Sequence, residues 1–379
     1  MTSSSGPDST LTRRALLAAS IGTSVALASH RPAFAVPQPL RPPLTPVPAV
    51  LSSTGTVGRQ QAPGFAVHHL GVSWSGPEQA GRLRLRYQDG WHDWQSVAAA
   101  DSADERRRAL LWVGDATAYE FIPVRGSGQV RLHAINTVDG PPTAATFATT
   151  DRLVDFDPAG AADSARCPRF RYKSRAAWGA DESLRFGPDG TESFPTAFFD
   201  VQTLTVHHTV TANSDPDPAA TVRAIYFFQA VTEDFGDIGY HLLIDQRGTV
   251  YEGRYSGPDP RPVFGPRSVG PRPSMVNGAH VGGFNAGNVG VALLGDLTST
   301  GPTPAARRSL TLVLAALARV TDLNPLGTTA YVNPISGATR TVSTIAGHRD
   351  WAATECPGNT FYPTLPQLRI DVAAALDHH

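Results

Sequence analysis

The sequence predicts two folded parts: a small all-β, sandwich-like domain, then an α/β domain whose mixed central sheet is flanked by helices. Over residues 62–148, short runs such as RLRLRY alternate apolar and polar residues, and Gly, Pro, Asp or Ser bounds each run. This pattern is typical of antiparallel strands with one buried face. Over residues 168–379, continuous apolar runs such as NVGVALLG alternate with stretches of helical period, which indicates buried strands covered by helices.

Start signals predict the helices of the α/β domain. Asp217 precedes Pro218 and Thr303 precedes Pro304, so each pair offers a capping side chain and a proline at the first helical position. A last helix is predicted to start at Pro366. The predicted strands are TLTVHH, YHLLI, NVGVALLG and STIAGH, with a hairpin turning at 245–248.

Composition and net charge limit the classes of partner that we expect. The chain has 379 residues, of which 41% are hydrophobic and 17% charged, which is ordinary globular material. Its net charge of −1 gives no electrostatic reason to expect nucleic acid or an anionic membrane as a partner.

The N-terminus is predicted to be an export signal of the twin-arginine type, residues 1–35. Arg13 and Arg14 precede an apolar stretch over 15–28, and an Ala-Phe-Ala cleavage pattern ends at Ala35. The apolar stretch is shorter than the roughly 20 residues that span a bilayer. We therefore expect a secreted protein without stable membrane insertion after cleavage, although an N-terminal anchor or a disordered basic tail is an alternative. Linkers are predicted over 36–61, which is rich in proline, and over 149–167.

Two cysteines and two histidines allow two interpretations. In an oxidising compartment, Cys167 and Cys356 would by default form a disulfide. Alternatively, His207, His348 and Cys356 supply two imidazoles and one thiolate, a zinc ligand set that leaves the fourth position open for water. His207 and His348 each end a predicted strand, and Cys356 follows His348 in a loop that can fold back. The residues alone leave both interpretations open.

A second pair, His68 and His69, lies in the β-domain. Adjacent strand residues face opposite sides, and no Cys or carboxylate loop accompanies them. We expect them to be packed or on the surface rather than to bind a metal.

Five segments occur in the order seen in peptidoglycan recognition proteins and the related type-2 N-acetylmuramoyl-L-alanine amidases. They are SRAAWGA (174–180), LTVHHT (204–209), DIGYHLLIDQRGTVYEGR (237–254), GAHVGGFNAGNVGVALLGD (278–296) and GHRDWAATECPG (347–358). Over residues 168–376 the chain resembles this family, whose binding-only members typically lack the cysteine found here at 356. The resemblance implies that His207, His348 and Cys356 bind one Zn²⁺. It also implies an enzyme, associated with the cell wall, that cleaves the lactyl–L-alanine bond of peptidoglycan with a zinc-activated water.

The resemblance places Tyr240 and Thr354 beside the reacting carbonyl. Each hydroxyl can donate a hydrogen bond to a tetrahedral oxyanion. The alternatives are that Tyr240 belongs to the core and that Thr354 only orders its loop. Some amidase relatives carry a glutamate on the strand that here reads Ala292-Leu293-Leu294, so no general base is evident.

The predicted substrate-binding residues are His208, Phe235, Arg254, His280 and Asn285. The resemblance suggests that His280 and Asn285 contact the stem peptide or sugar, and Arg254 suits a diaminopimelate carboxylate. Local backbone bonds or a surface ion pair are the alternatives. His208 should face away from His207 along its strand and could orient a metal ligand. Asp234-Phe235 stands where relatives show Gly-Trp or Asn-Phe, which leaves the diaminopimelate-versus-lysine preference open.

Two other functions compete with the amidase. The domain could bind cell-wall fragments without turnover, or Cys356 could act as a nucleophile with His348 as its base. The sequence assigns the β-domain no site and gives Cys167 no partner.

Overall fold

The computed structural model describes residues 45–99, 106–148, 150–154, 168–258, 261–265 and 273–377, which all lie in one compact unit. The predicted export signal, Cys167 and most of the linker over 149–167 lie outside the described residues. No helix of the described part is long and apolar enough to cross a membrane.

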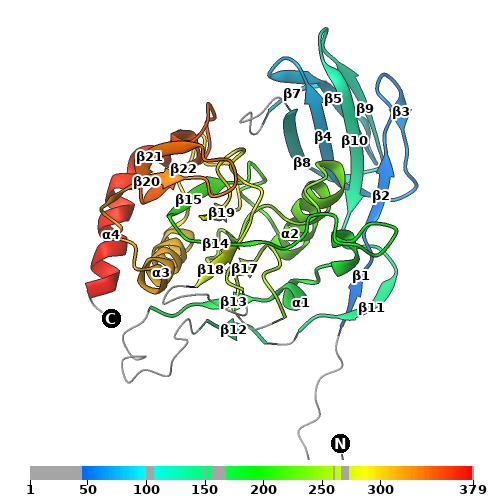
Figure 1. Cartoon of the computed structure of the whole chain (residues 1–379). Coiled ribbons are helices and arrows are strands. Elements are labelled where there is room, and N and C mark those ends of the chain that lie inside the picture. The colour runs from blue at the N-terminus through cyan, green and yellow to red at the C-terminus, as the bar shows by residue number, and fades with distance from the viewer. Residues whose placement is uncertain are drawn as a thin grey trace, which may run out of the picture. The chain divides into compact units, whose positions relative to one another are not determined.

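The β-domain consists of two antiparallel sheets around one core (Figure 1). One sheet has the order β2 (Leu51–Thr54), β10 (Gly128–Asn136), β4 (Val67–Ser75) and β8 (Arg106–Ala116). The other has the order β3 (Gln60–Gln61), β9 (Ala118–Pro123), β5 (Gln79–Tyr87) and β6 (Gly90–Trp91), and β7 (Gln95–Ala98) also pairs with β5. Trp74, Tyr119 and Phe121 are fully buried between the sheets. The expected sandwich-like arrangement is confirmed.

The predicted linker over 36–61 contains strands. Besides β2 and β3, β1 (Pro46–Pro48) pairs with β11 (Pro142–Thr146), and β2 forms the edge of its sheet beside β10. Proline is tolerated in edge strands because one side of the backbone needs no ladder bond. The proline content hid this pairing, so the described part of that linker belongs to the fold.

A mixed seven-stranded sheet forms the centre of the α/β domain, as expected. Its order is β12 (Arg152–Leu153), β13 (Arg171–Lys173), β17 (Val250–Glu252), β16 (Leu242–Ile244), β19 (Asn288–Leu293), β15 (Thr203–His208) and β22 (Ile345–Gly347). Strands β16, β19, β15 and β22 run parallel, whereas β17 is antiparallel to β16.

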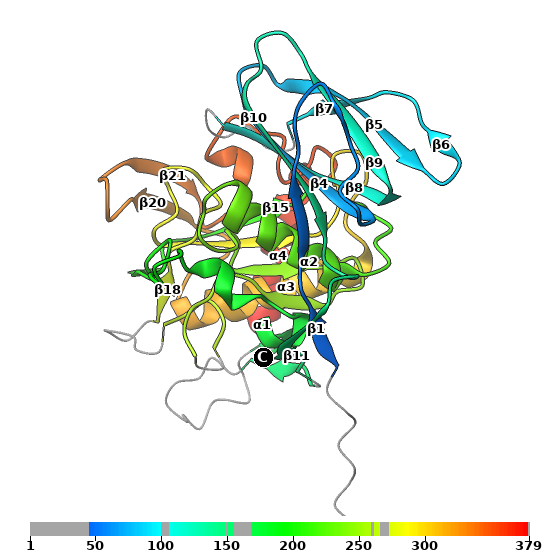
Figure 2. The ribbon, with the colours of Figure 1, turned by 90° about the vertical axis from the view of Figure 1, so that its right-hand side faces the viewer.

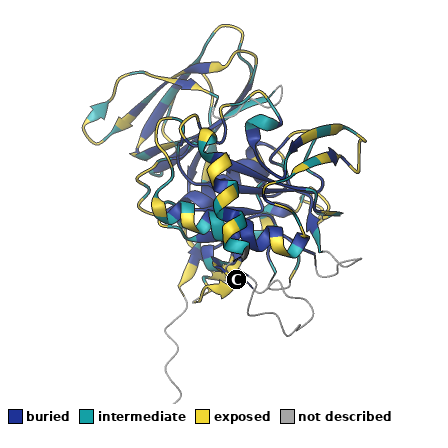
Figure 3. Ribbon diagram, turned by 90° about the vertical axis from the view of Figure 1, so that its left-hand side faces the viewer, coloured by how far each residue is buried: buried dark blue, intermediate teal, exposed yellow. Residues whose placement is uncertain are grey.

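Helices cover both faces of this sheet. On one face, Leu204 and Val206 of β15 pack with α3 (Pro304–Thr321) and α4 (Leu365–Asp377). Figure 3 shows buried residues gathered in the central strands, while outward turns of the covering helices are exposed. On the other face, Ala292 of β19 packs with α2 (Pro218–Phe227), and the same cluster takes in Leu110 and Ile135 of the β-domain. Figure 2 shows α2 between the central sheet and strands β4 and β8.

The predicted helix starts after Asp217 and Thr303 are confirmed, whereas α4 begins at Leu365, one residue before the predicted Pro366. The Asp217 side chain accepts from the backbone N–H of Ala220, and the Thr303 side chain accepts from that of Ala306. A π-helical turn, η3 (Phe228–Thr232), extends α2. The remaining elements are α1 (Arg175–Trp178), the pairs β14 (Phe198–Asp200) with β18 (Ser274–Val276) and β20 (Thr328–Val332) with β21 (Thr339–Ser343), and the 3-10 turns η2 (Glu182–Arg185), η4 (His348–Asp350) and η5 (Tyr362–Thr364).

Candidate metal centre

His207, His348 and Cys356 meet at one edge of the central sheet. His207 lies near the end of β15, and His348 follows the neighbouring parallel strand β22, so both strands deliver a histidine to the same edge. One ligand atom of each of the three residues lies within 4.8 Å of the others, and all three side chains are buried. His207 Nδ1 is 3.6 Å from Cys356 Sγ, and the two imidazole rings are 4.6 Å apart between centroids.

This donor set fits zinc. Two imidazoles and one thiolate form a common three-ligand zinc set, and a site with three protein ligands keeps a position for water or substrate. The backbone N–H of His208 donates to the Sγ of Cys356 at 3.4 Å, an arrangement that suits a thiolate ligand. The cluster therefore favours the zinc interpretation over the disulfide.

Hydrogen bonds hold the loop that carries Cys356. The backbone N–H of Arg349 donates to the carbonyl of Cys356 at 3.0 Å, and Asp350 accepts from the N–H of Gly347 at 2.8 Å. The Thr354 hydroxyl oxygen accepts from the N–H of Cys356 at 3.1 Å. Thr354 thus orders the loop, as its alternative role required, and its O–H hydrogen can still be donated.

His280 contacts a metal-ligand candidate. Its Nδ1 lies 3.0 Å from His207 Nε2, and its Nε2 lies 2.9 Å from the backbone carbonyl oxygen of Asn288. Burial lowers the pKa of both His207 and His280 well below the usual range, and neighbouring imidazoles lower it further. His280 contacts His207, and its expected substrate contact stays a prediction.

A pocket opens beside this centre. Tyr240, two residues before β16, is partly exposed, and its ring centroid is 5.2 Å from that of His207. The pocket is lined by Tyr240, His280, Phe235 and Phe228, and on its other side by Arg108, Ala109 and Leu110 of β8. The predicted catalytic residue Tyr240 and the predicted substrate residue Phe235 thus share one pocket with the β-domain.

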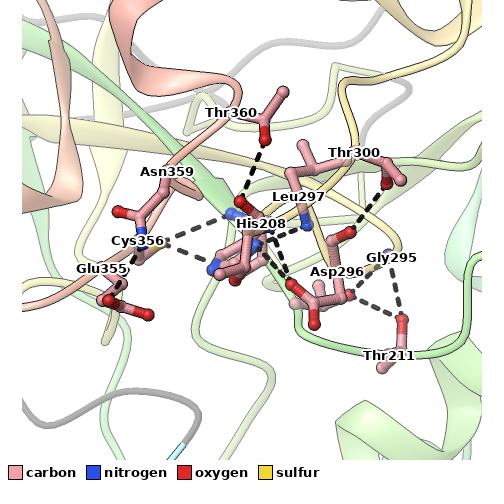
Figure 4. A network of polar contacts seen from close by, with 12 residues as sticks. His208, Thr211, Gly295, Asp296, Leu297, Thr300, Glu355, Cys356, Asn359 and Thr360 are labelled. Carbon is pink, nitrogen blue, oxygen red and sulfur yellow. Dashed lines mark hydrogen bonds and ion pairs between the residues drawn. The ribbon is translucent and has the colours of Figure 1, made fainter.

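Three other predicted substrate residues have structural contacts. His208 points to the opposite face of β15 from His207, where its Nδ1 accepts from the N–H of Leu297 at 3.0 Å (Figure 4). Asn285 Oδ1 accepts from the N–H groups of His280 and Val281. Arg254 is only 3% exposed and donates to the carbonyl of Ile238, and it lines a different, small hollow with Asp237. These contacts agree with the local-backbone alternative, although His208 is also among the residues that line the pocket beside Tyr240.

Strand β19, which lies beside His207 and is described over its whole length, contains no carboxylate. Ala292 is the residue paired with His207 across β15 and β19, and its side chain packs in the cluster around α2. Sequence reasoning missed the contribution of β8. Its run RRRALLWVGDA is typical of an ordinary strand. Arg108 reaches the pocket only because the β-domain packs against the α/β domain.

The His68–His69 pair is packed, as expected. His69 Nε2 lies 3.3 Å from the Thr221 hydroxyl of α2, and His68 Nε2 lies 3.0 Å from an oxygen of Asp115.

Part of this chain is similar to known N-acetylmuramoyl-L-alanine amidases and peptidoglycan-recognition proteins. Residues 198–359 match the family model for N-acetylmuramoyl-L-alanine amidase. The chain is 30% identical over 170 residues to the human N-acetylmuramoyl-L-alanine amidase, covering 43% of this chain and 23% of that protein. It is 29% identical over 140 residues to peptidoglycan-recognition protein SD of Drosophila melanogaster, covering 37% and 57%. Neither alignment reaches two thirds of the relative's length. A crystal structure of Drosophila peptidoglycan recognition protein SD matches with 24% identity and a TM-score of 0.37, covering 51% of this chain and 92% of that one.

Proposed function

We propose that the C-terminal domain of this chain is a zinc-dependent amidase of the family of N-acetylmuramoyl-L-alanine amidases and peptidoglycan recognition proteins. The match of residues 198–359 to the amidase family model and the similarity to the human amidase support this proposal. Its proposed reaction is hydrolysis of the amide between the lactyl group of muramic acid and L-alanine in bacterial peptidoglycan. The observation that carries the proposal is the meeting of Cys356 with His207 and His348, with ligand atoms within 4.8 Å of one another.

His207, His348 and Cys356 would hold the zinc ion. A zinc ion in such a site lowers the pKa of water to about 7 and polarises a carbonyl group. The surrounding chain buries both imidazoles, and for His207 this burial lowers the pKa well below the usual range, which favours the neutral form that binds metal.

Tyr240 is the proposed donor to the oxyanion. Its ring packs against His207 at the wall of the pocket, so its hydroxyl group can reach a carbonyl held at the metal centre. Thr354 is a second donor candidate, since its hydroxyl oxygen accepts from Cys356 while its hydrogen can still be donated. With Ala292 beside His207, the chain offers no carboxylate base on that strand. We propose that Tyr240 assists proton transfer instead.

The stem peptide is proposed to enter the pocket beside Tyr240. Phe235 offers an apolar surface there, and the Arg108 guanidinium lies over its ring at 5.2 Å. The β-domain would then form one wall of the substrate site. We further propose export and a cell-wall location from the signal pattern over residues 1–35.

The deciding experiment combines metal analysis of the purified protein with mass spectrometry of digested peptidoglycan. We expect about one zinc per chain and release of stem peptides that begin with L-alanine, abolished by a chelator and restored by zinc. A zinc-loaded protein that binds muropeptides without releasing peptide would instead be a recognition module. Turnover that survives zinc removal but is lost on thiol alkylation would indicate Cys356 as a nucleophile.

A further inference from the structure

We propose that His280 is a positioning residue that fixes the tautomer of His207, so that His207 presents Nδ1 to the metal. This proposal deepens the metal site proposed above and rests on it. It gives His280, besides its predicted substrate contact, a place in a relay of hydrogen bonds that runs from a backbone carbonyl to a metal ligand.

The relay begins at the carbonyl oxygen of Asn288. A carbonyl oxygen can only accept, and it lies 2.9 Å from His280 Nε2, so this nitrogen carries the proton. The carbonyl is rigidly placed, because Asn288 is fully buried and its side-chain oxygen accepts from the Thr205 hydroxyl at 2.7 Å. A neutral His280 ring protonated on Nε2 has a lone pair on Nδ1.

That lone pair determines the state of His207. His280 Nδ1 accepts, so His207 Nε2, at 3.0 Å, must donate. The neutral His207 ring then has its own lone pair on Nδ1, the atom that lies 3.6 Å from Cys356 Sγ. Metal-binding histidines usually donate their other N–H to a carboxylate, a carbonyl or water, which fixes the ring orientation. Here a second imidazole takes that role.

Close packing fixes the His280 ring itself. A Cβ atom added at Gly290 would lie 2.7 Å from His280 Cγ, and one at Gly278 would lie 2.9 Å from His280 Cδ2. The backbone N–H of His280 donates to Asn285 Oδ1 at 2.8 Å. Two glycines and an asparagine capping the loop therefore hold the ring against His207, which gives Asn285 a supporting role in the same relay.

A matched pair of variants separates the two nitrogens of His280. In His280→Asn, the side-chain oxygen can stand near the position of Nδ1 and still accept from His207. In His280→Gln, the amide can stand near Nε2 and still donate to Asn288, but it offers His207 no acceptor. We expect zinc affinity within a few-fold of wild type for His280→Asn, and a loss of about 10- to 100-fold for His280→Gln. Equal affinity for the two variants, or tighter binding by His280→Gln, would overturn the proposal.

Two further variants test the packing and the general effect of losing a buried imidazole. Gly290→Ala removes no group of the relay but forces the His280 ring to move, so we expect it to weaken zinc binding as well. His69→Gln removes a buried imidazole of the β-domain and should bind zinc like wild type. Thermal unfolding of the zinc-free variants verifies that each is folded. Wild-type affinity in a folded Gly290→Ala would count against the relay.

The tautomers can also be observed without metal or activity. Long-range ¹H–¹⁵N correlation spectra of the zinc-free protein should show His207 and His280 both neutral and protonated on Nε2. His207 protonated on Nδ1 would overturn the proposal. This readout remains valid if the protein has no amidase activity, so failure of the relay and failure of the proposed function are distinguishable.

Discussion

The Nδ1 atom of His207 lies 3.6 Å from the Sγ atom of Cys356, although 149 residues separate them in the chain. The parallel pairing of β15 with β22 brings His348 to the same edge, and the loop after η4 returns Cys356 to it. The ligand set therefore depends on sheet topology and not on a local sequence motif alone.

Each of the three ligand candidates should be needed for zinc. His207→Ala, His348→Ala and Cys356→Ser each remove one of three protein donors, so we expect each purified variant to contain far less zinc than wild type. Atomic absorption on dialysed protein measures this directly. Zinc content equal to wild type in all three variants would remove the assignment of the site.

Tyr240→Phe should keep zinc and lose rate. The substitution deletes only the hydroxyl, and loss of one oxyanion donor typically lowers turnover by about 100- to 1,000-fold. Tyr226→Phe is the matched control, because the buried Tyr226 hydroxyl in α2 has no hydrogen-bond partner among the described residues. Peptide release from muropeptides under saturating zinc gives the comparison. If both variants turned over at the wild-type rate, Tyr240 would have no catalytic role.

The sequence predicted the residues whose chemistry is rare. Cys356 and the two histidines at strand ends stood out because thiolate and imidazole side chains seldom occur at such positions without a reason, and the structure brings them together. The capping residues Asp217 and Thr303 also placed the starts of two helices correctly, because a capping side chain acts only on its own helix end.

Contacts between distant segments were not predictable in this way. Nothing in the GAHVGGFN segment indicates that the His280 ring would lie against His207, because that contact depends on how the loop before β19 folds over the sheet. Arg254 looked suited to a carboxylate ligand, yet it is buried beneath Phe194, whose ring centroid lies 4.5 Å from its guanidinium carbon. Side-chain type indicated possible chemistry, whereas packing decided which residues reach the pocket.

The interface between the two domains should depend on Arg108. Its Nε donates to Glu233 Oε2 at 3.0 Å, and the Glu233 side chain is 0% exposed. Arg108→Ala removes the ion-pair partner of this buried carboxyl group and leaves only the weaker influence of Arg106, so we expect a loss of up to roughly 3–5 kcal/mol in unfolding free energy. Denaturant titration of wild type and Arg108→Ala measures this difference in unfolding free energy.

Arg131 provides the control for that measurement. It also joins the β-domain to the segment after η3, through an ion pair with Asp234, but the two side chains are 44% and 68% exposed. Arg131→Ala should therefore cost no more than about 1 kcal/mol. Equal losses for Arg108→Ala and Arg131→Ala would show that burial of the Glu233 pair does not determine the strength of the interface.

His69 should make the protein less stable in acid. Burial, together with the positive charge of nearby His68, lowers the pKa of His69 from 6.5 to about 3. The unfolded chain therefore binds this proton first as the pH falls. The stabilising effect of a neutral His69 is complete above pH 6.5 and is lost progressively toward pH 3. In that window His69 alone contributes a slope of about 1.4 kcal/mol per pH unit to the unfolding free energy.

The variant His69→Gln tests this, because glutamine cannot titrate and the other buried histidines contribute equally to both proteins. Between pH 6 and pH 4, the unfolding free energy of His69→Gln should fall less steeply than that of wild type, by about 1.4 kcal/mol per pH unit. Parallel profiles for wild type and His69→Gln would mean that His69 is not held neutral in the folded protein.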